Sequence, residues 1–578
     1  MMKKQLEKLS REKLQEIILK MTKLLSEEQC QNLEALIEEC IAGGSESEPS
    51  SPPPMPARMS QEFVDEKMSQ LKDWMEQIDE GELYLNTEEY EDYSSGYWDA
   101  DWITEYFDNQ GIGDKLTSII RFAKDCVDDR RYEEAKFVYE WLWEMNVSTD
   151  SEWDEGVDLE VLAEEGIIHI DLEQTALLTL YADYQVLDAD KRAENIYLYF
   201  TYHAFGKLRL EDMFYAGREN LAGREQFWKD WIALLKTKSG DVEGRLLREA
   251  VLHHEGAEGL VKMADENCQI HPSLYLAAME ECDKTHDYGK IEKIGERALE
   301  KIDDRLIIRS ETALKAAYAS SCLMHEEAVM RFCWEAFRSD STVRNFLRLF
   351  GTKEMAEQYG LRGKEVLNAR IKGDSAYNVR NLELRQNTIE NDVYYMLSFY
   401  TGNFEKVKAA SKNPKGSLGW SGCFIRYGIR LFLLYLYERP LPTKAASGIA
   451  NYLGFGGGAA ESRCIMGFES KIEEESREYG VSVFWNYFQR WKQYFPMEAE
   501  ERKRYLRWAK KIVCSRADAI VSGQHRGHYG AAAELLAMAA EVEEDMGIAG
   551  AKREIFAEYK KKFPRHSSFQ AEMKRYFT

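Results

Sequence analysis

The sequence has little proline and glycine, with 11 and 38 of them among 578 residues. A protein made of many short strands needs frequent turns rich in these residues, so their scarcity argues against such a fold. A long hydrophobic run is missing too, because the most apolar stretch, residues 429–437, has about half the length that spans a bilayer and contains Arg430. The first residues alternate charge with leucine and lack the apolar core of a secretory signal. We expect a mostly helical, cytoplasmic protein with no membrane contact.

Cysteine pairs and positive charge are also scarce. The ten cysteines form no C-x-x-C pair, and a chain of this size does not need a disulfide framework, so we expect reduced, mostly buried thiols. Lys and Arg number 76 against 101 Asp and Glu, which gives a net charge of −25. That charge disfavours broad attraction to DNA, RNA or an anionic membrane. We therefore expect protein partners.

The length of the chain indicates more than one folded region. A single hydrophobic core rarely serves 578 residues, so we expect several domains or a repeat array. Residues 44–60 are rich in proline, serine and glycine, which is typical of a flexible linker. Apolar residues at helical spacing predict a small helical hairpin before it, over residues 1–43. After it we predict an acidic, aromatic-rich segment over 61–110 and an α-helical repeat domain over 111–578.

The acidic segment, residues 61–110, concentrates the negative charge. It holds 16 Asp and Glu against two Lys, and its aromatic residues, Trp98 and Trp102 among them, are anchors that a simple solvated tail lacks. Asp99 and Asp101 have the spacing that begins a calcium loop, but the required glycine is absent, so we expect an acidic loop with buried tryptophans. Three roles fit the segment: docking on a basic protein surface, occluding the groove of the helical domain, or capping the first repeat.

Four helical segments start alike, with an aromatic residue after a polar turn and a small or apolar residue three positions later. The pairs are Tyr132 with Ala135, Tyr288 with Ile291, Phe404 with Val407, and Tyr529 with Ala532. Apolar residues at the sixth position lie on the same helix face. This resembles the helix start of a tetratricopeptide-like unit, and the irregular intervals indicate degenerate repeats. We predict an all-α fold, an α-solenoid of degenerate helix pairs with a small N-terminal helical hairpin.

The stretch HRGHYGAAAELLAMAAEV places His525, Arg526 and His528 directly before one of these helix starts. A catalytic histidine needs an oriented partner, and the local sequence identifies none, so we interpret the stretch as the turn between two repeats. The alternative is a site for a phosphate or a carboxylate at the helix N-terminus, which Arg565 and His566 would join.

Two cysteines and two histidines have zinc-finger-like spacing, namely Cys268, His271, Cys282 and His286. The residues between the two pairs favour a helix that starts near Pro272 and separates the pairs by roughly 16 Å. One zinc ion cannot bridge that distance. We interpret these residues as core cysteines and turn histidines, with metal binding as the weaker alternative.

Two other motifs lose their chemical meaning in context. The glycine-rich stretch 454–464 lacks the lysine and the hydroxyl of a phosphate-binding loop. His325 and Glu326 begin like the helix of a zinc protease, but Val329 stands where the second histidine would be. We therefore predict no catalytic residue, no metal and no cofactor.

Two runs of the sequence carry a family resemblance. The C-terminal run ADAIVSGQHRGHYGAAAELLAMAAEVEEDMGIAGAKREIFAEYKKKFPRHSSFQAEMKRYF is similar to the last helical repeats of bacterial proteins that carry an N-terminal SWIM zinc finger followed by a long helical region. The run LSREKLQEIILKMTKLLSEEQCQNLEALI is similar to the short helical stretch after their finger. The C-x-C and C-x-H patterns of the finger are absent from this sequence. The resemblance therefore implies the helical scaffold alone.

Three hypotheses for function follow. The first is a non-enzymatic protein-interaction scaffold or adaptor, which holds its partner on the solenoid surface. The second is a nucleic-acid-associated subunit of a larger complex, which His525, Arg526, Arg565 and His566 would support. The third is an enzyme whose catalytic residues are dispersed in sequence and assembled by the fold. The first is our prediction, and the sequence leaves the oligomeric state open.

Overall fold

The computed structural model describes residues 58–92, 101–151, 156–369, 381–454 and 483–577. The predicted hairpin over 1–43 lies outside the described residues, and so does the predicted linker over 44–60 apart from its last three residues. The chain divides into two compact units. Unit 1 comprises Met1–Lys115 and Met145–Val157, and unit 2 comprises Leu116–Glu144 and Asp158–Thr578.

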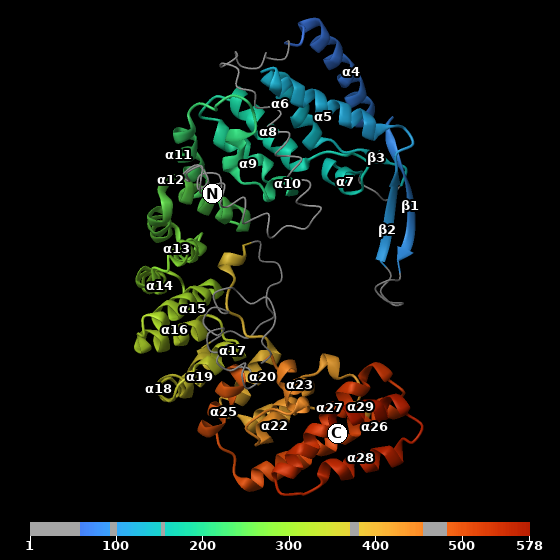
Figure 1. Cartoon of the computed structure of the whole chain (residues 1–578), viewed down its shortest axis with the longest axis vertical. Helices are drawn as coiled ribbons and strands as arrows, with labels where there is room; N and C mark the ends of the chain where they lie inside the picture. Colours follow the sequence, from blue (N-terminus) through green and yellow to red (C-terminus); the bar gives the residue numbers. More distant parts are fainter. Residues whose placement is uncertain (1–57, 93–100, 152–155, 370–380, 455–482, 578) are drawn as a thin grey trace, which may run out of the picture. The chain divides into compact units, whose positions relative to one another are not determined.

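The described part of unit 1 contains a helix and a small sheet (Figure 1). The helix α4 (Gln61–Asp79) begins after Ser60, whose hydroxyl accepts a hydrogen bond from the backbone N–H of Phe63 and caps the helix. Its buried residues form one apolar face and are Val64, Leu71, Met75 and Ile78. The strands are β1 (Tyr84–Asp92), β2 (Asp101–Phe107) and β3 (Ser148–Thr149).

The sheet has the strand order β2-β1-β3, with β2 antiparallel and β3 parallel to β1. The Asp150 carboxylate accepts hydrogen bonds from Asn86 Nδ2 and from the Thr87 backbone N–H, both at 2.8 Å, and these bonds lower its pKa. They also hold the end of β3 beside β1. Trp102 lies in β2 and is 68% exposed, so the expected loop with buried tryptophans is wrong at this residue. Because β3 has only two residues, most of β1 and β2 forms a two-stranded ribbon, and such a ribbon leaves much of each strand's surface to solvent.

Unit 2 is built of helices joined by short turns (Figure 1). In its first half the α-helices are α5 (Ile112–Asp128, which begins in unit 1), α6 (Tyr132–Glu144), α7 (Leu159–Glu164), α8 (Leu172–Val186), α9 (Arg192–Tyr199), α10 (His203–Gly206), α11 (Arg224–Leu235), α12 (Asp241–Asn267), α13 (Ser273–Asp283), α14 (Tyr288–Lys301), α15 (Ile307–Cys322), α16 (Glu326–Ser339), α17 (Val343–Arg348) and α18 (Lys353–Gln358).

In its second half the described α-helices are α19 (Gly363–Ala369), α20 (Asn391–Tyr400), α21 (Phe404–Ala410), α22 (Ile425–Leu436), α23 (Lys444–Tyr452), α25 (Val483–Tyr494), α26 (Ala499–Ser522), α27 (Tyr529–Asp545), α28 (Ala551–Lys562) and α29 (Ser567–Phe577). Short 3-10 helices lie between them, namely η1 (Leu210–Tyr215), η2 (Gly360–Arg362), η3 (Leu382–Leu384), η4 (Lys415–Ser417), η5 (Trp420–Gly422) and η6 (Arg526–His528).

The four predicted helix starts are confirmed. The helices α6, α14, α21 and α27 begin at the aromatic residues, which are Tyr132, Tyr288, Phe404 and Tyr529. The residues three positions later are all buried, namely Ala135, Ile291, Val407 and Ala532. In three of the preceding turns the residue two positions before the aromatic has a positive φ; these are Arg130, His286 and Gly402. A left-handed residue of this kind ends one helix and turns the chain toward the next.

The helices α12 to α16 pack against one another in chain order. The closest approach between α14 and α15 occurs at Gly295. A Cβ at this position would lie 2.4 Å from the Cβ of Ala316 and 3.1 Å from the terminal methyl of Met279. The missing side chain therefore lets these two helices come together.

A largely non-helical segment, residues 381–390, crosses this stack, and we call it the crossing segment. The backbone N–H of Leu382 donates to Asp241 at the start of α12, at 2.9 Å. The backbone N–H of Ser273 at the start of α13 donates to Glu383, at 3.0 Å. Both contacts join the crossing segment to helix N-termini, and Glu383 supplies an acceptor for a free backbone donor at the start of α13.

Further along, the crossing segment reaches the next two helix junctions. The backbone N–H of Ile307 at the start of α15 donates to the Arg385 carbonyl, at 2.9 Å. The buried Asn387 side chain accepts from the Ser341 N–H and donates to the Arg338 carbonyl, at 3.3 and 3.2 Å. The segment thus ties together residues of α12, α13, α15 and α16.

The predicted fold class is confirmed, because the described chain is mostly helical and its neighbouring helices pack into a solenoid-like all-α arrangement. The sheet of unit 1 is the local exception. Among the described helices, none combines the length and the apolar character that a membrane span requires.

Candidate functional site

A cavity of about 420 Å³ lies in unit 2, where α22, α26 and α27 meet, and we call it the arginine pocket. Its arginines are Arg426, Arg430 and Arg516, its histidines are His525 and His528, and its largest apolar lining residues are Trp420, Tyr452, Leu418, Ile520 and Leu535. None of the described residues that line it is an Asp or a Glu. In a chain with a net charge of −25, this is a local excess of positive charge.

Arg430 is the most deeply placed cation of the pocket. Its residue is 5% exposed, and it stands within the apolar helix α22. One of its terminal nitrogens donates to the Arg426 carbonyl at 2.7 Å, while its Nε has no hydrogen-bond partner among the described residues. Its guanidinium lies 3.8 Å from the centre of the Tyr452 ring. Burial lowers the pKa of Arg430, and Tyr452 and Glu534 oppose that shift.

Arg516 reaches the pocket from α26. It donates to the Ser417 carbonyl at 2.8 Å, and its guanidinium lies 5.1 Å from the centre of the buried Trp420 ring. Burial lowers the pKa of Arg516, and the like charge of Arg430 lowers it further. The two guanidiniums therefore repel each other across the pocket. An arginine keeps its proton under such conditions, so both stay positively charged.

Arg426, one turn before Arg430, is the cation whose charge is balanced. It forms an ion pair with Asp392 of α20 at 3.0 Å and donates to the Ser421 carbonyl. Burial disfavours its charged form, but Asp392 and the neighbouring tyrosines outweigh that effect and raise its pKa. Its Nε also has no partner among the described residues. Arg426 thus lines the pocket without being the main source of its free charge.

One acid that acts on Arg430 lies outside the lining. Glu534 of α27 packs against Gly448 of α23, where a Cβ would come within 2.0 Å of its carboxylate. Burial raises the pKa of Glu534, and the nearby Arg430 opposes that rise. The two side chains form no ion pair in the part of the chain that the structure describes. Arg430 is therefore only partly neutralised.

Of the residues that the sequence predicts for an anion site, only some line the arginine pocket. His525 and His528 line the mouth of the arginine pocket, in the turn that η6 forms between α26 and α27. Arg526 is exposed and belongs to the same turn but not to the lining. His566 lies elsewhere, with its Nδ1 3.2 Å from the Tyr529 hydroxyl, and the neighbouring Arg565 is exposed. No interaction of these last two with His525 or His528 is found among the described residues.

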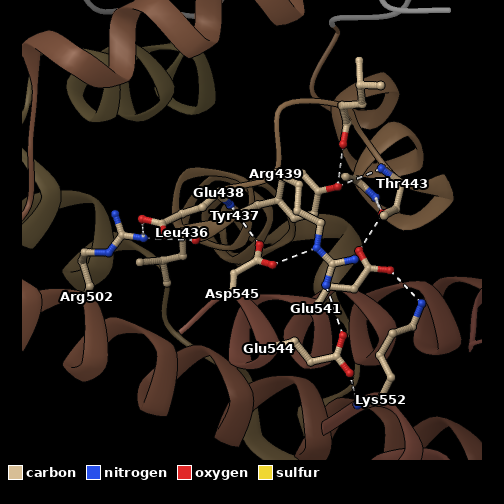
Figure 2. Close-up of polar contacts among 12 residues, drawn as sticks. Leu436, Tyr437, Glu438, Arg439, Thr443, Arg502, Glu541, Glu544, Asp545 and Lys552 are labelled. Atoms are coloured by element: carbon tan, nitrogen blue, oxygen red, sulfur yellow. Dashed lines mark hydrogen bonds and ion pairs between the residues drawn. The ribbon is translucent and has the colours of Figure 1, made fainter. Parts of the chain in front are cut away.

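A polar network braces the helices that carry the pocket (Figure 2). Arg439, in the turn after α22, donates to Asp545 at 2.8 Å and to Glu544 at 3.1 Å, at the C-terminal end of α27. Glu541, 1% exposed, accepts from Thr443 at 2.5 Å and from Lys552 at 2.9 Å. These bonds hold α22, α23, α27 and α28 together. A cation at the end of α27 also suits the helix dipole.

The predicted metal candidates belong to the helix junctions of unit 2. The helix α13 lies between the pairs, as the sequence predicts, and the thiol of Cys268 donates to the Lys301 carbonyl at 3.7 Å. Burial raises the pKa of Cys268 and of Cys282, whereas a metal ligand must lose its proton. His286 is exposed, with a positive φ in the turn before α14. The described residues contain no cluster of three or more metal-ligand side chains.

His271, the fourth candidate, is fully buried. Its Nε2 lies 2.9 Å from the Lys238 carbonyl, and its Nδ1 lies 3.8 Å from the Glu383 carboxylate of the crossing segment. A Cβ at Gly244 would come within 2.0 Å of that carboxylate. Burial raises the pKa of Glu383, but its polar contacts with His271 and Ser273 outweigh that effect, so the net shift is downward; of the two, the Ser273 N–H donates a hydrogen bond. The arrangement anchors the crossing segment.

Trp98, the other predicted partner-binding tryptophan, lies outside the described residues. Trp102 is exposed on β2 of unit 1, as stated above. Trp102 does not line the arginine pocket.

A second cavity, of about 800 Å³, lies beside α14 and α16 and has the opposite charge. Its acids include Glu292, Glu296 and Glu326. Two of them have partners, because His325 lies 3.1 Å from Glu292 and Arg331 pairs with Glu296 at 2.6 Å. Arg331 thus neutralises part of its charge, as Asp392 does for Arg426 in the arginine pocket.

The lining of the arginine pocket combines arginines that can bind an anion with apolar side chains beside them. Guanidinium N–H groups bind carboxylates and phosphates strongly. The rings of Trp420 and Tyr452 and the side chain of Leu535 offer contact to an aromatic or aliphatic group. The sequence interpretation missed the arginines, although Arg430 was visible as a charge in the most apolar stretch. A charge in a helix that is otherwise buried is a signal for such a site.

No protein-family model matches this chain, and the comparison with curated proteins finds no match either. The resemblance to SWIM-finger proteins therefore stays a prediction.

Proposed function

We propose that this protein is a non-enzymatic scaffold or adaptor, and that it binds a protein partner through an acidic group held in the arginine pocket. The helical stack supports this proposal, because packed helix pairs present a large, pre-formed surface to a partner. The crossing segment adds to the rigidity of that surface, since it joins residues of α12, α13, α15 and α16.

One observation carries the proposal. Arg430 and Arg516 line the pocket without a carboxylate partner among the described residues, although the chain has an excess of acids. An unbalanced charge in a buried place is costly, so such a site is usually completed by a ligand of opposite charge. Because arginine does not release its proton, these residues suit binding better than proton transfer.

The proposed location is the cytoplasm. The described cysteines are all free, and a reducing compartment keeps thiols in that state.

The test is an affinity purification of the tagged chain from its native cells at low salt, with proteins identified by mass spectrometry and nucleic acid quantified in the same eluate. The matched sample is the double variant Arg430→Met with Arg516→Met. We expect a stoichiometric protein partner with the natural sequence and its loss with the double variant. Turnover of a defined substrate by the purified chain, with no partner recovered, would contradict the scaffold.

The second candidate is a nucleic-acid-associated subunit. The pairing of cations with the Trp420 and Tyr452 rings favours it, since bases stack on such rings while phosphates meet the charges. In the same purification, nucleic acid that co-elutes at low salt and is lost at high salt would support this candidate, because phosphate contacts weaken steeply with ionic strength.

A further inference from the structure

The positive charge that has no acidic partner in the arginine pocket indicates the charge of a matching ligand. Arg430 and Arg516 each carry one positive charge and have no acidic partner among the described residues. Arg426 is already paired with Asp392. Because Glu534 offsets part of the Arg430 charge, a ligand that balances the pocket should carry between one and two negative charges.

The number of guanidiniums in the pocket indicates how many acceptor oxygens a matching anionic group has. Arg426 and Arg430 both line the cavity, and they come from successive turns of α22. Arg516 adds a third guanidinium from α26. A carboxylate has one charge and two oxygens and is satisfied by a single arginine. A phosphate monoester has a charge of about −1.5 to −2 at neutral pH and three acceptor oxygens, which fits three guanidiniums.

The size of the cavity shows that the anion is one part of a larger ligand. At about 420 Å³ the cavity falls in the range of small-molecule sites, of roughly 300–1,000 Å³, and far exceeds a phosphate. The rest of the lining is aromatic or aliphatic and includes Trp420, Ile520 and Leu535. An apolar group attached to the phosphate would remove this surface from water.

We propose that the arginine pocket binds a phosphate monoester, with its phosphate against Arg430 and Arg516 and its apolar ester group against Trp420 and Leu535. The proposal rests on the proposed binding function and names the chemical group that the pocket recognises. Two sources can supply this group, a phosphorylated tyrosine side chain of a protein and a small organic phosphate.

The experiment is a calorimetric titration of the full chain at pH 7.5 with phenyl phosphate, inorganic phosphate and phenylacetate. We expect phenyl phosphate to bind at least about tenfold more tightly than phenylacetate, because charge-assisted bonds to a dianion outnumber those to a carboxylate. It should also bind more tightly than inorganic phosphate, because only the ester has an apolar group. Equal affinity for phenyl phosphate and phenylacetate, or no binding at millimolar concentrations, would overturn the proposal.

Substitutions of single arginines test whether phenyl phosphate binds in the arginine pocket. Arg430→Met and Arg516→Met should each weaken phenyl phosphate binding by about tenfold to a hundredfold, since each removes charge-assisted hydrogen bonds. Arg507→Met is the matched control, because Arg507 is an exposed arginine of α26 outside the lining, and it should leave the affinity unchanged. Arg430→Lys keeps the buried charge and should lose part of the affinity. It is the control for Arg430→Met, because it separates a loss of ligand contacts from a folding defect. Unchanged affinity in both methionine variants would overturn the proposal.

A phosphotyrosine peptide separates the two sources. If the peptide binds at least tenfold more tightly than phenyl phosphate, the ligand is a phosphorylated protein; if the two bind equally, it is a small organic phosphate. The purification described above separates this proposal from the proposed function. A partner that is captured through the arginines while phenyl phosphate fails to bind would leave the adaptor standing and overturn the phosphate.

Discussion

The guanidinium of Arg430 lies 3.8 Å from the centre of the Tyr452 ring. Arg430 belongs to α22 and Tyr452 is the last residue of α23, so the contact joins two helices at the arginine pocket. A ring face stabilises a cation without neutralising it. The contact therefore orients the charge of Arg430 and leaves it available to an anion.

The first prediction concerns this ring. Replacing Tyr452 with Leu should weaken phenyl phosphate binding by about threefold to tenfold, because a cation–π contact contributes about 0.5–2 kcal/mol to holding the guanidinium in place. Tyr452→Phe keeps the ring face and should bind like the natural sequence. Calorimetric titration measures both. An equal loss in the two variants would mean that the hydroxyl, and not the ring, matters.

A second prediction tests the contact of α14 with α15. Gly295→Ala should lower the free energy of unfolding by about 1–3 kcal/mol, because the new methyl would overlap with Ala316. Gly289→Ala on the same helix is the control, since its nearest neighbour, Asp287, would be 3.9 Å away. It should stabilise by up to about 1 kcal/mol through helix propensity. Thermal unfolding compares them, and similar shifts in both would show that α14 and α15 are not in close contact.

A third prediction concerns the network of Figure 2. Lys552→Met removes a partner of Glu541, which is 1% exposed, and should destabilise the fold by about 2 kcal/mol because a buried carboxylate loses its cation. Lys503→Met is the control, since Lys503 pairs with Glu500 on an exposed surface and should not change the unfolding midpoint. Equal effects of the two substitutions would show that the network does not stabilise these helices.

A fourth prediction is a pH dependence. The pKa of Glu383 is lowered in the folded protein, so the unfolded state binds its proton first as the pH falls. The stability that this carboxylate contributes is fully present above its ordinary pKa of 4.5 and is lost as the pH falls through the lowered value. The difference in unfolding midpoint between the natural sequence and Glu383→Gln should therefore shrink from pH 6 toward pH 3. A difference that stays constant would mean that Glu383 is not the titrating group.

A fifth prediction concerns the crossing segment. Asn387→Ala removes three hydrogen bonds, to Ser341 and to the Arg338 carbonyl, from a buried position. Hydrogen–deuterium exchange should become faster at the N–H groups of Ser341 and Ile307, because the segment no longer holds them. Gln226→Ala, on an exposed face of α11, is the control and should leave these rates unchanged. Unchanged exchange in Asn387→Ala would show that the segment does not brace the junctions.

Helix starts could be predicted well from local sequence. Tyr132, Tyr288, Phe404 and Tyr529 each follow a polar turn, and each begins a helix. The strands of unit 1 could not be predicted in this way. Neither β1 nor β2 alternates strictly between apolar and polar side chains, so the usual pattern of a strand is missing, and their pairing depends on contacts between two separate segments.

The anion site could be predicted only in part. The histidines His525 and His528 stood out in the sequence because they precede a helix start, and they do line the pocket. The arginines that supply its charge lie in other helices, and nothing local links Arg430 with Arg516. The prediction grouped His566 with His525 and His528, but its Nδ1 instead lies 3.2 Å from the Tyr529 hydroxyl.

The sequence by itself determined the helical character of the chain, the places where helices begin and the apolar face of each. These features depend on the spacing of apolar residues and on turn residues a few positions apart. Only the tertiary structure decided that Arg430 and Arg516 share one cavity while Arg565 and His566 lie outside it. The reason is physical: which side chains meet depends on how α22, α26 and α27 pack, and packing joins residues far apart in the chain.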